Sequence, residues 1–307
     1  MKTCPLFSIC GGCRYDFTAP DYRAKKIAHI SDWELGAEPF WTDVGQRRRA
    51  DFCFADGAFG FYARASKDVT PVKNCPNLVP EINAVLPKIA ELPWAGTGSA
   101  LITLCENGLD LAITADVPYF TAEFKRAVEK LNLLRVTWNG TVVVQRAVPQ
   151  IKFGDKLIDY PSGAFLQPTV QSETAMRDFV VRHVAGAPRV LDLFCGIGNF
   201  TFATGAAGFD IAGTGVRRDL FARPLLPKTL NNYDVVIMDP PRAGAAEQTR
   251  ELARSNVAKI IYVSCNPASL RRDAATLIKA GYKMTECAAF DQFVGSDHWE
   301  IAAVFQK

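Results

Sequence analysis

Residues Val190–Phe200, with the sequence VLDLFCGIGNF, decide the fold class of this chain. The apolar run Arg189–Phe194 is expected to form a buried strand that enters a Gly-x-Gly turn, and a helix is expected to follow. Gly196 and Gly198 would let the backbone approach a ligand closely, and the helix N-terminus would add free N–H groups. Two glycines alone are a modest signal, but the wider string is far more specific than an ordinary strand–turn–helix connection.

The C-terminal half repeats this alternation of strand-like and helix-like segments. From about Gln167 onward, apolar runs of strand length recur between stretches of helical character: Arg189–Phe194, Tyr233–Met238, Lys259–Val263 and Trp299–Phe305. Such alternation is typical of a parallel sheet with helices on both faces. The sequence therefore predicts an α/β fold in which ligands bind at the carboxyl ends of the strands.

Two further loops follow predicted strands, and both carry reactive side chains. In Asp234–Arg242 (DVVIMDPPR), an acid at the strand end precedes two prolines that stiffen the loop. In Tyr262–Asp273 (YVSCNPASLRRD), Cys265 lies between a strand and a helix N-terminus, where a lowered pKa would favour the thiolate. The alternative for the first loop is a Pro-rich connection without a functional role, and the alternative for Cys265 is a buried structural cysteine. Three such loops at strand ends favour a shared site with Cys265 as the nucleophile.

Ser296–Glu300 (SDHWE) precedes the last predicted strand and places Glu300 on the same edge. A carboxylate there could act as a general base. Taken alone, Glu300 would be interpreted as an ordinary surface acid and His298 as a structural histidine. Because Cys265 is expected at the same edge, the general-base role is favoured for Glu300.

The first half of the chain has a different pattern. Short alternating runs between about Phe40 and Ile151 predict half-buried strands in an α+β arrangement: Ala50–Phe54, Leu101–Leu104, Leu109–Thr114 and Val142–Gln145. Asn107-Gly108 predicts a hairpin between two of them, and Thr121–Leu131 and Pro20–Ser31 predict helices. We expect three units: a cysteine segment at 1–39, a central α+β domain at 40–155, and an α/β domain at 156–307.

Composition limits the class of protein. A chain of 307 residues with 49% hydrophobic and 22% charged residues is an ordinary globular protein of about two domains. No apolar run approaches the ~20 residues that span a bilayer, and Met1–Cys10 lacks a secretory signal, so a cytoplasmic protein without membrane contact is expected. The net charge of +3 says little about partners. The triplet Arg47–Arg49 is more typical of a solvated face than of a nucleic-acid-binding stripe.

Four of the nine cysteines have the spacing of metal ligands. Cys4, Cys10 and Cys13 lie close together, and Cys75 follows far downstream. In a cytosolic chain with an odd number of cysteines, disulfides are not expected. Four thiolates suit either a four-iron cluster or a tetrahedral zinc ion, and coordination chemistry alone does not separate the two. Cys53, Cys105 and Cys287 are interpreted as small core residues.

Together these strings resemble the RNA 5-methyluridine methyltransferase family, and the resemblance runs from Cys4 to Glu300. It implies a Rossmann-like class I methyltransferase domain that uses S-adenosyl-L-methionine and acts on a uridine in RNA. The resemblance also implies a [4Fe-4S] cluster rather than zinc at the cysteines. Because the cysteines come first, the chain is similar to a branch without an N-terminal β-barrel RNA-binding module. That branch implies 23S rRNA as the substrate, with tRNA as the other possibility in the family.

The family's site residues transfer by motif. Gln167, within GAFLQP at 163–168, would contact S-adenosylmethionine, and Phe194 and Asn199 would line the same pocket. Asp239 matches the acid of the Asp-Pro-Pro-Arg loop. Cys265 matches the nucleophile that adds to carbon 6 of uracil, and Glu300 the base that removes the carbon 5 proton. The target base must be splayed out of structured RNA to reach such a site. No obligate protein partner is evident.

One segment departs from the family pattern. Only Gly208–Asn232 separates the first helix from the strand at Tyr233, whereas a βαβ unit takes roughly 30 residues or more. We therefore expect at least one strand and one helix to be missing from the cofactor-binding half. Asp219 would then be an adenine-side residue, or it would replace the acid that binds the ribose. The shortening keeps a second hypothesis open, a non-catalytic RNA-binding relative, and a third is a methyltransferase that acts on a base nitrogen.

Overall fold

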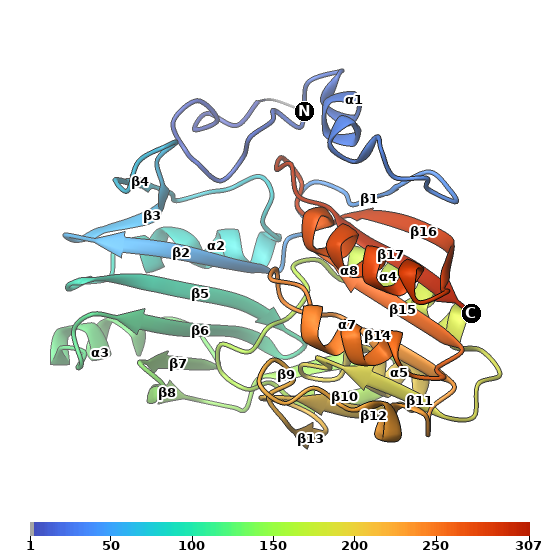
Figure 1. Ribbon diagram of the computed structural model, residues 1–307. Helices are drawn as coiled ribbons and strands as arrows, with labels where there is room; N and C mark the ends of the chain where they lie inside the picture. Colours follow the sequence, from blue (N-terminus) through green and yellow to red (C-terminus); the bar gives the residue numbers. More distant parts are fainter. Residues whose placement is uncertain (1–2) are drawn as a thin grey trace.

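The strand that ends at the glycine loop lies inside a largely parallel sheet. In the computed structural model, which describes residues 3–307, this sheet has eight strands in the order β1-β16-β17-β15-β14-β11-β12-β13 (Figure 1). Its strands are β1 (Phe40–Trp41), β11 (Val190–Leu193), β12 (Ala207–Asp210), β13 (Val216–Arg217), β14 (Val235–Met238), β15 (Lys259–Ser264), β16 (Lys283–Asp291) and β17 (Glu300–Gln306). All four apolar runs predicted as strands in this half are confirmed.

Helices cover the sheet, and their bounds are α4 (Val170–Val184), α5 (Asn199–Thr204), α6 (Pro227–Leu230), α7 (Ala246–Ala253) and α8 (Pro267–Lys279). Two separate apolar cores fill the two faces, one around Leu191 and Tyr262 and one around Ile237 and Val263. Within residues 3–307 no helix is long and apolar enough to cross a membrane.

Strand direction explains where the site lies. β11 pairs in parallel with β12 and β14, and β14 pairs in parallel with β15. The loops after β11, β14 and β15 therefore emerge at the same edge of the sheet. β17 runs antiparallel between β15 and β16, so its first residue, Glu300, begins at that edge too.

The central part of the chain forms a second sheet beside the first (Figure 1). Its order is β4-β3-β2-β5-β6-β7-β8, and the bounds are β2 (Arg49–Ala55), β3 (Ala58–Tyr62), β4 (Val69–Pro71), β5 (Thr97–Cys105), β6 (Gly108–Ala115), β7 (Arg135–Trp138) and β8 (Thr141–Gln145). The helices here are α2 (Pro80–Ala90) and α3 (Ala122–Val128), and a separate hairpin joins β9 (Gln150–Phe153) to β10 (Lys156–Asp159). The β5–β6 hairpin at Asn107-Gly108 and the helix predicted from Thr121 are confirmed.

Two expected unit boundaries do not coincide with the structure. The cut between 155 and 156 falls inside the β9–β10 hairpin. β1, expected to open the central unit, pairs instead with β16 in the eight-stranded sheet, at Phe40↔Phe290. The segment before it contains α1 (Tyr22–Ile27) and a 3-10 turn (Ala28–Ile30), where one helix was predicted.

The shortened segment corrects another expectation. Both β12 and β13 are present outside β11, so no strand is missing from this edge of the sheet. The unusual feature is their connection: β12 and β13 are parallel, with Asp210 opposite Arg217, yet only residues 211–215 join them, and these contain no helix. A parallel crossover normally needs a dozen or more residues. Ile211 and Val216 are correspondingly exposed, at 57% each.

A buried ion pair attaches the N-terminal segment to the sheet. The Nζ atom of Lys26 lies 2.5 Å from Oδ1 of Asp291, at the end of β16, and both side chains are almost fully buried. Lys26 also lies over the ring of Trp299. Burial lowers the pKa of Lys26, and the carboxylate of Asp291 opposes that effect.

Replacing Lys26 tests how much this attachment stabilises the fold. We expect Lys26→Met to lower the free energy of unfolding by about 3–5 kcal/mol, because Asp291 is left buried without its counter-charge. The neighbouring Lys25 forms an exposed pair with Asp21, so Lys25→Met should cost less than about 1 kcal/mol. Urea unfolding of both variants measures the difference, and equal losses would contradict a structural role for the buried pair.

Candidate active site

A cavity of about 620 Å³ opens at the sheet edge where the three loops meet. All seven residues predicted to form the site line it: Gln167, Phe194, Asn199, Asp219, Asp239, Cys265 and Glu300. They come from the segment before α4, from the loops after β11, β13, β14 and β15, and from the start of β17. The structure thus brings together residues separated by more than a hundred positions in the sequence. Their individual roles remain predictions.

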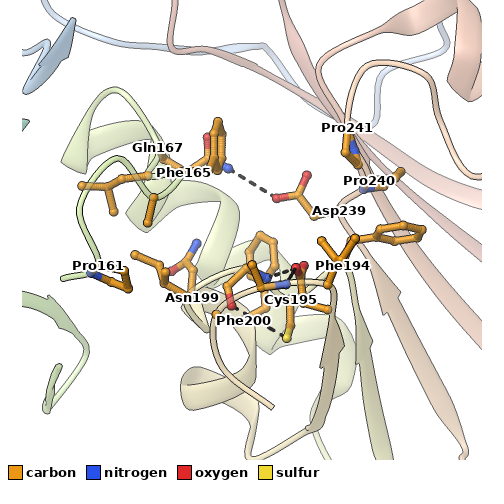
Figure 2. Close-up of a pocket in the computed structure, with 18 of the residues that line it drawn as sticks. Pro161, Phe165, Gln167, Phe194, Cys195, Asn199, Phe200, Asp239, Pro240 and Pro241 are labelled. Carbon is orange, nitrogen blue, oxygen red and sulfur yellow. Dashed lines mark hydrogen bonds between the residues drawn. The ribbon is translucent and has the colours of Figure 1, made fainter. Parts of the chain in front are cut away.

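The glycine loop forms the floor of the cavity. Gly198 has φ +99°, and a Cβ atom there would lie 2.6 Å from the ring of Phe202. Phe194, at the end of β11, also has a positive φ of 62°, which is a strained conformation for a bulky residue. Such strain at the start of a loop is typical of functional sites. Figure 2 shows Phe194, Cys195, Asn199 and Phe200 around this turn.

Several buried polar atoms of the lining residues have no hydrogen-bond partner. They are Oε1 of Gln167, both amide atoms of Asn199 and Oε2 of Glu300. Nε2 of Gln167 is 3.4 Å from Oδ2 of Asp239, across the cavity in Figure 2. Because unpaired buried polar atoms are costly, this arrangement is suited to a bound polar ligand.

Two carboxyl groups, Asp239 in the cavity lining and the nearby Asp192, have pKa values far above the usual range. Burial raises the pKa of Asp239 to about 7, and the nearby Asp192 adds to the shift. Burial likewise raises the pKa of Asp192 to about 7, although Thr201 donates a hydrogen bond to it at 2.6 Å. Acid groups with such shifts mark candidate functional sites.

The raised pKa of Asp239 has a consequence for stability. The ordinary pKa of an unfolded Asp is about 3.9, so between pH 4 and 7 the folded state holds a proton that the unfolded state has lost. Wild-type stability therefore decreases as pH rises through this window. Asp239→Asn removes the effect, and we expect it to raise the free energy of unfolding by ~1–3 kcal/mol at pH 8 and by little at pH 4.

Denaturant unfolding at both pH values checks this expectation. Asp234, just before the same strand, is the matched control, since its partner Arg189 lowers its pKa. Asp234→Asn should shift stability at pH 8 in the opposite direction. A difference between wild type and Asp239→Asn that is the same at both pH values would contradict the assignment.

The structure corrects the expected ionisation of Cys265. The residue lies between β15 and α8, as predicted, and Asn266 caps that helix by accepting from the N–H of Ala268. Burial, Glu300 and Asp239 nevertheless raise the pKa of Cys265 to about 12, and Arg242 opposes them only partly. The resting group is therefore a thiol, and the prediction of a lowered pKa is wrong. A proton must leave the sulfur during any attack.

Asp210 is a site residue that the sequence reasoning missed. It ends β12 and lines the cavity, and its carboxylate accepts from the N–H groups of Gly196, at 3.0 Å, and Ala212, at 2.8 Å. An acid at the carboxyl end of the second strand is where doubly wound folds bind a ribose. Asp219, by contrast, accepts from the N–H groups of Phe221 and Ala222 and closes a turn. The short apolar run before Asp210 was the available signal.

The four predicted metal ligands lie outside the helices and long strands: Cys4, Cys10 and Cys13 precede α1, and Cys75 lies between β4 and α2. Burial, with smaller contributions from Cys75, Cys10 and Cys4, raises the pKa of Cys13 to about 12, so the four thiols lie in the same region of the molecule. The backbone N–H of Gly12 donates to Cys10, and the side-chain amide of Asn77 donates to Cys13. Among residues 3–307, no three His, Cys, Asp or Glu side chains are gathered closely enough to hold a metal ion.

The arginine triplet is not the solvated face that the sequence favoured. Arg48 is buried and pairs with Glu173 at 2.6 Å. Arg47 donates from Nε to the carbonyl oxygen of Arg49, and its guanidinium lies near Cys75 and Cys13. Arg49 lies over the ring of Phe165, at the cavity. The triplet thus joins the central sheet to the site and to the cysteines.

Comparison with a solved structure identifies the fold. Over 99% of this chain and 87% of the other, the fold matches the crystal structure of a Pyrococcus abyssi tRNA (uracil-54, C5)-methyltransferase in complex with S-adenosyl-L-homocysteine, with a TM-score of 0.73 and 18% identity. The fold is therefore that of an α/β methyltransferase.

Sequence comparisons define the family. The chain is 38% identical over 348 residues to an uncharacterized RNA methyltransferase of Brucella suis, covering 99% of this chain and 84% of that protein. It is 28% identical to a Salmonella typhi 23S rRNA (uracil(1939)-C(5))-methyltransferase, covering 99% and 81%. The family model described as tRNA (Uracil-5-)-methyltransferase matches residues 221–307. The chain belongs to the RNA (uracil-5-)-methyltransferase family, and it is an enzyme of that family.

Proposed function

We propose that this protein methylates carbon 5 of a specific uridine in 23S rRNA, through a covalent adduct between Cys265 and carbon 6 of the base. The observation that carries the proposal is the single cavity that holds Cys265 and Glu300 together with the polar residues of the glycine loop. Acyl-, phosphoryl- or hydride-transfer sites do not require this pairing of a thiol with a carboxylate. Carbon 5 of uracil becomes nucleophilic only after a nucleophile adds at carbon 6, which is the role that a thiol can fill.

The cavity residues fit S-adenosylmethionine, which supplies an electrophilic methyl group when bound. The unpartnered atoms of Asn199 and Gln167 suit its amino acid portion, and the carboxylate of Asp210 suits the ribose hydroxyls. Phe221, 47% exposed beside Phe194, offers an apolar surface to an adenine ring. Asp219 would stand on this adenine side rather than at the ribose.

The chain's own residues account for the remaining steps. The thiol of Cys265 passes its proton to Asp239, one of the two carboxylates beside it, and the sulfur bonds to carbon 6 of the splayed-out base as the carbon 5–carbon 6 double bond opens. After methyl transfer to carbon 5, Glu300 removes the carbon 5 proton, the double bond re-forms and the sulfur leaves. Low exposure of Glu300 keeps water away from this proton transfer.

The choice of 23S rRNA rests on the Salmonella relative, whose name gives that substrate. The test incubates the protein with methyl-labelled S-adenosylmethionine and unmodified rRNA or tRNA. The expected result is one 5-methyluridine in 23S rRNA. Modification of tRNA alone would mean that the substrate is tRNA and not 23S rRNA. Methylation of a base nitrogen would overturn the proposed mechanism.

A non-catalytic RNA-binding relative is the second candidate, and one observation favours it. The five-residue connection between β12 and β13 is shorter than parallel crossovers normally are, and the alignment with the Brucella protein runs over 348 residues, more than the 307 of this chain. The short connection places a shortening in the cofactor-binding half, and the alignment length is consistent with residues missing relative to that protein. Calorimetry separates the candidates, since micromolar binding of S-adenosylmethionine supports the enzyme, and RNA binding without it supports the alternative.

We also infer that Cys4, Cys10, Cys13 and Cys75 bind a [4Fe-4S] cluster. Support comes from the placement of the four thiols in one region, the two N–H donors to sulfur and the nearby guanidinium of Arg47. Cluster assembly requires the thiols to move closer together, because no metal-holding group is gathered among the described residues. Iron and sulfide analysis of anaerobically purified protein tests this, with Cys75→Ala expected to lose the cluster and zinc without iron contradicting it.

A further inference from the structure

Gln292 and Glu300 form a buried polar pair beside the cavity. Gln292 directly follows β16 and is 1% exposed, and Glu300 begins β17 and is 3% exposed. Nε2 of Gln292 donates a hydrogen bond to Oε1 of Glu300 at 2.7 Å. Since an amide nitrogen only donates and an ionised carboxylate only accepts, this bond favours the ionised carboxylate and fixes its plane.

The bond leaves the other oxygen of the carboxylate available. Oε2 of Glu300 is buried and has no hydrogen-bond partner. Glu300 lines the cavity together with Cys265 and Asp239. Oε1 of Glu300 is therefore held by Gln292, while Oε2 has no protein partner and can accept a proton from a ligand in the cavity.

The backbone on either side of Gln292 is held by hydrogen bonds. Lys26 donates to both sequence neighbours of Gln292, to Oδ1 of Asp291 at 2.5 Å and to the carbonyl oxygen of Phe293 at 2.8 Å. Tyr22 donates to the other oxygen of Asp291 at 3.1 Å. The N-terminal segment thus holds residues 291–293 from one side, and pairing with β17 holds β16 from the other.

We propose that Gln292 is a positioning residue that presents Oε2 of Glu300 to carbon 5 of the target uracil. The inference rests on the proposed function. In the step concerned, the carbon 5–hydrogen bond breaks and the proton goes to Oε2. Its electron pair forms the carbon 5–carbon 6 double bond, and the carbon 6–sulfur bond breaks to release Cys265 as thiolate. Gln292 keeps its bond to Oε1 and does not touch the substrate.

The charges around Glu300 determine how the loss of this bond changes the pH profile. Asp239, after β14, and Cys265, after β15, face it, while Arg242 lies beside Cys265 and near His298. Burial and then Asp239 raise the pKa of Glu300, whereas Gln292 lowers it. Removing Gln292 therefore raises this pKa further, and the rise of turnover with pH moves to higher pH.

The test variant is Gln292→Met, which keeps the length of the side chain but cannot donate. Multiple-turnover methylation should fall about 10- to 100-fold, with the acidic limb of the pH profile shifted upward. Because adduct formation does not need Glu300, denaturing gels should show more covalent protein–RNA complex than in wild type. S-adenosylmethionine affinity should be unchanged. Gln306→Met, at the far end of β17 from Glu300, is the matched control and should behave as wild type.

Gln292→Glu tests the inference independently of Gln292→Met and remains useful if that variant does not fold. A carboxyl group at 292 can donate to Glu300 only while protonated. Its turnover should therefore fall as pH rises from 6 to 8.5, where wild-type turnover rises. If the turnover of Gln292→Glu rose with pH as that of wild type does, the positioning role would be overturned. Turnover and adduct levels equal to wild type in Gln292→Met would overturn it too. Inactive wild type would instead refute the proposed function.

Discussion

Cys265→Ala is expected to abolish methyl transfer, with a loss of at least ~10³-fold under single-turnover conditions. Cys195, the other thiol at the cavity, follows β11 and not β15, and without addition at carbon 6 the target carbon stays unreactive. Cys265 is only partly buried and lines the cavity, so a substrate can reach its thiol from the cavity side. Label transfer from S-adenosylmethionine to RNA measures the loss.

Two controls separate a chemical effect from a structural one. Cys53, buried in β2 of the central sheet, makes only a weak bond to the carbonyl oxygen of Gly60, and Cys53→Ala should retain methylation. RNA containing 5-fluorouridine should form a covalent complex with wild type and with Cys53→Ala but none with Cys265→Ala. Methylation that persists in Cys265→Ala would contradict the covalent mechanism. It would support the alternative that the enzyme methylates a base nitrogen.

The high pKa of Cys265 adds a pH dependence to this chemistry. A thiol with a pKa of about 12 is almost wholly protonated at neutral pH. Attack therefore requires proton transfer to a carboxylate that is itself ionised. Burial raises the pKa of Asp239 to about 7, so this acceptor ionises near neutrality, and burial raises the pKa of Glu300 as well. Burial thus keeps the thiol of Cys265 protonated, and it also raises the proton affinity of the carboxylate that accepts its proton.

The sequence alone was sufficient to predict that these residues would share one cavity, and the reason is geometric. Parallel strands end at one edge of a sheet, so Asp239 after β14 and Cys265 after β15 had to emerge side by side once the strands were recognised. Glu300 joined them because its strand is antiparallel and begins where its neighbour ends. Periodicity and chain direction carry this information without any knowledge of side-chain packing.

Properties that depend on packing between distant segments could not be predicted in this way. The pKa of Cys265 is set by burial and by acids from two other strands, which outweigh the adjacent helix N-terminus. The bond between Gln292 and Glu300 requires the register of β16 against β17, which includes an irregularity near Glu286. The strand β12 was missed because four residues in a shortened segment give too little periodicity to recognise.

Glu300→Gln is expected to stop turnover while leaving the covalent step intact. The substitution preserves shape but removes the acceptor for the carbon 5 proton, so repeated methylation should fall ~10²–10⁴-fold. Cys265 can still add and the methyl group can still transfer, so a stable, methylated protein–RNA complex should accumulate on denaturing gels, to roughly one RNA per protein. Glu247→Gln, on the exposed face of α7, is the control and should turn over normally. Absence of the trapped complex in Glu300→Gln would mean that Glu300 acts before adduct formation, as the acceptor of the Cys265 proton, and would assign the carbon 5 proton to Asp239.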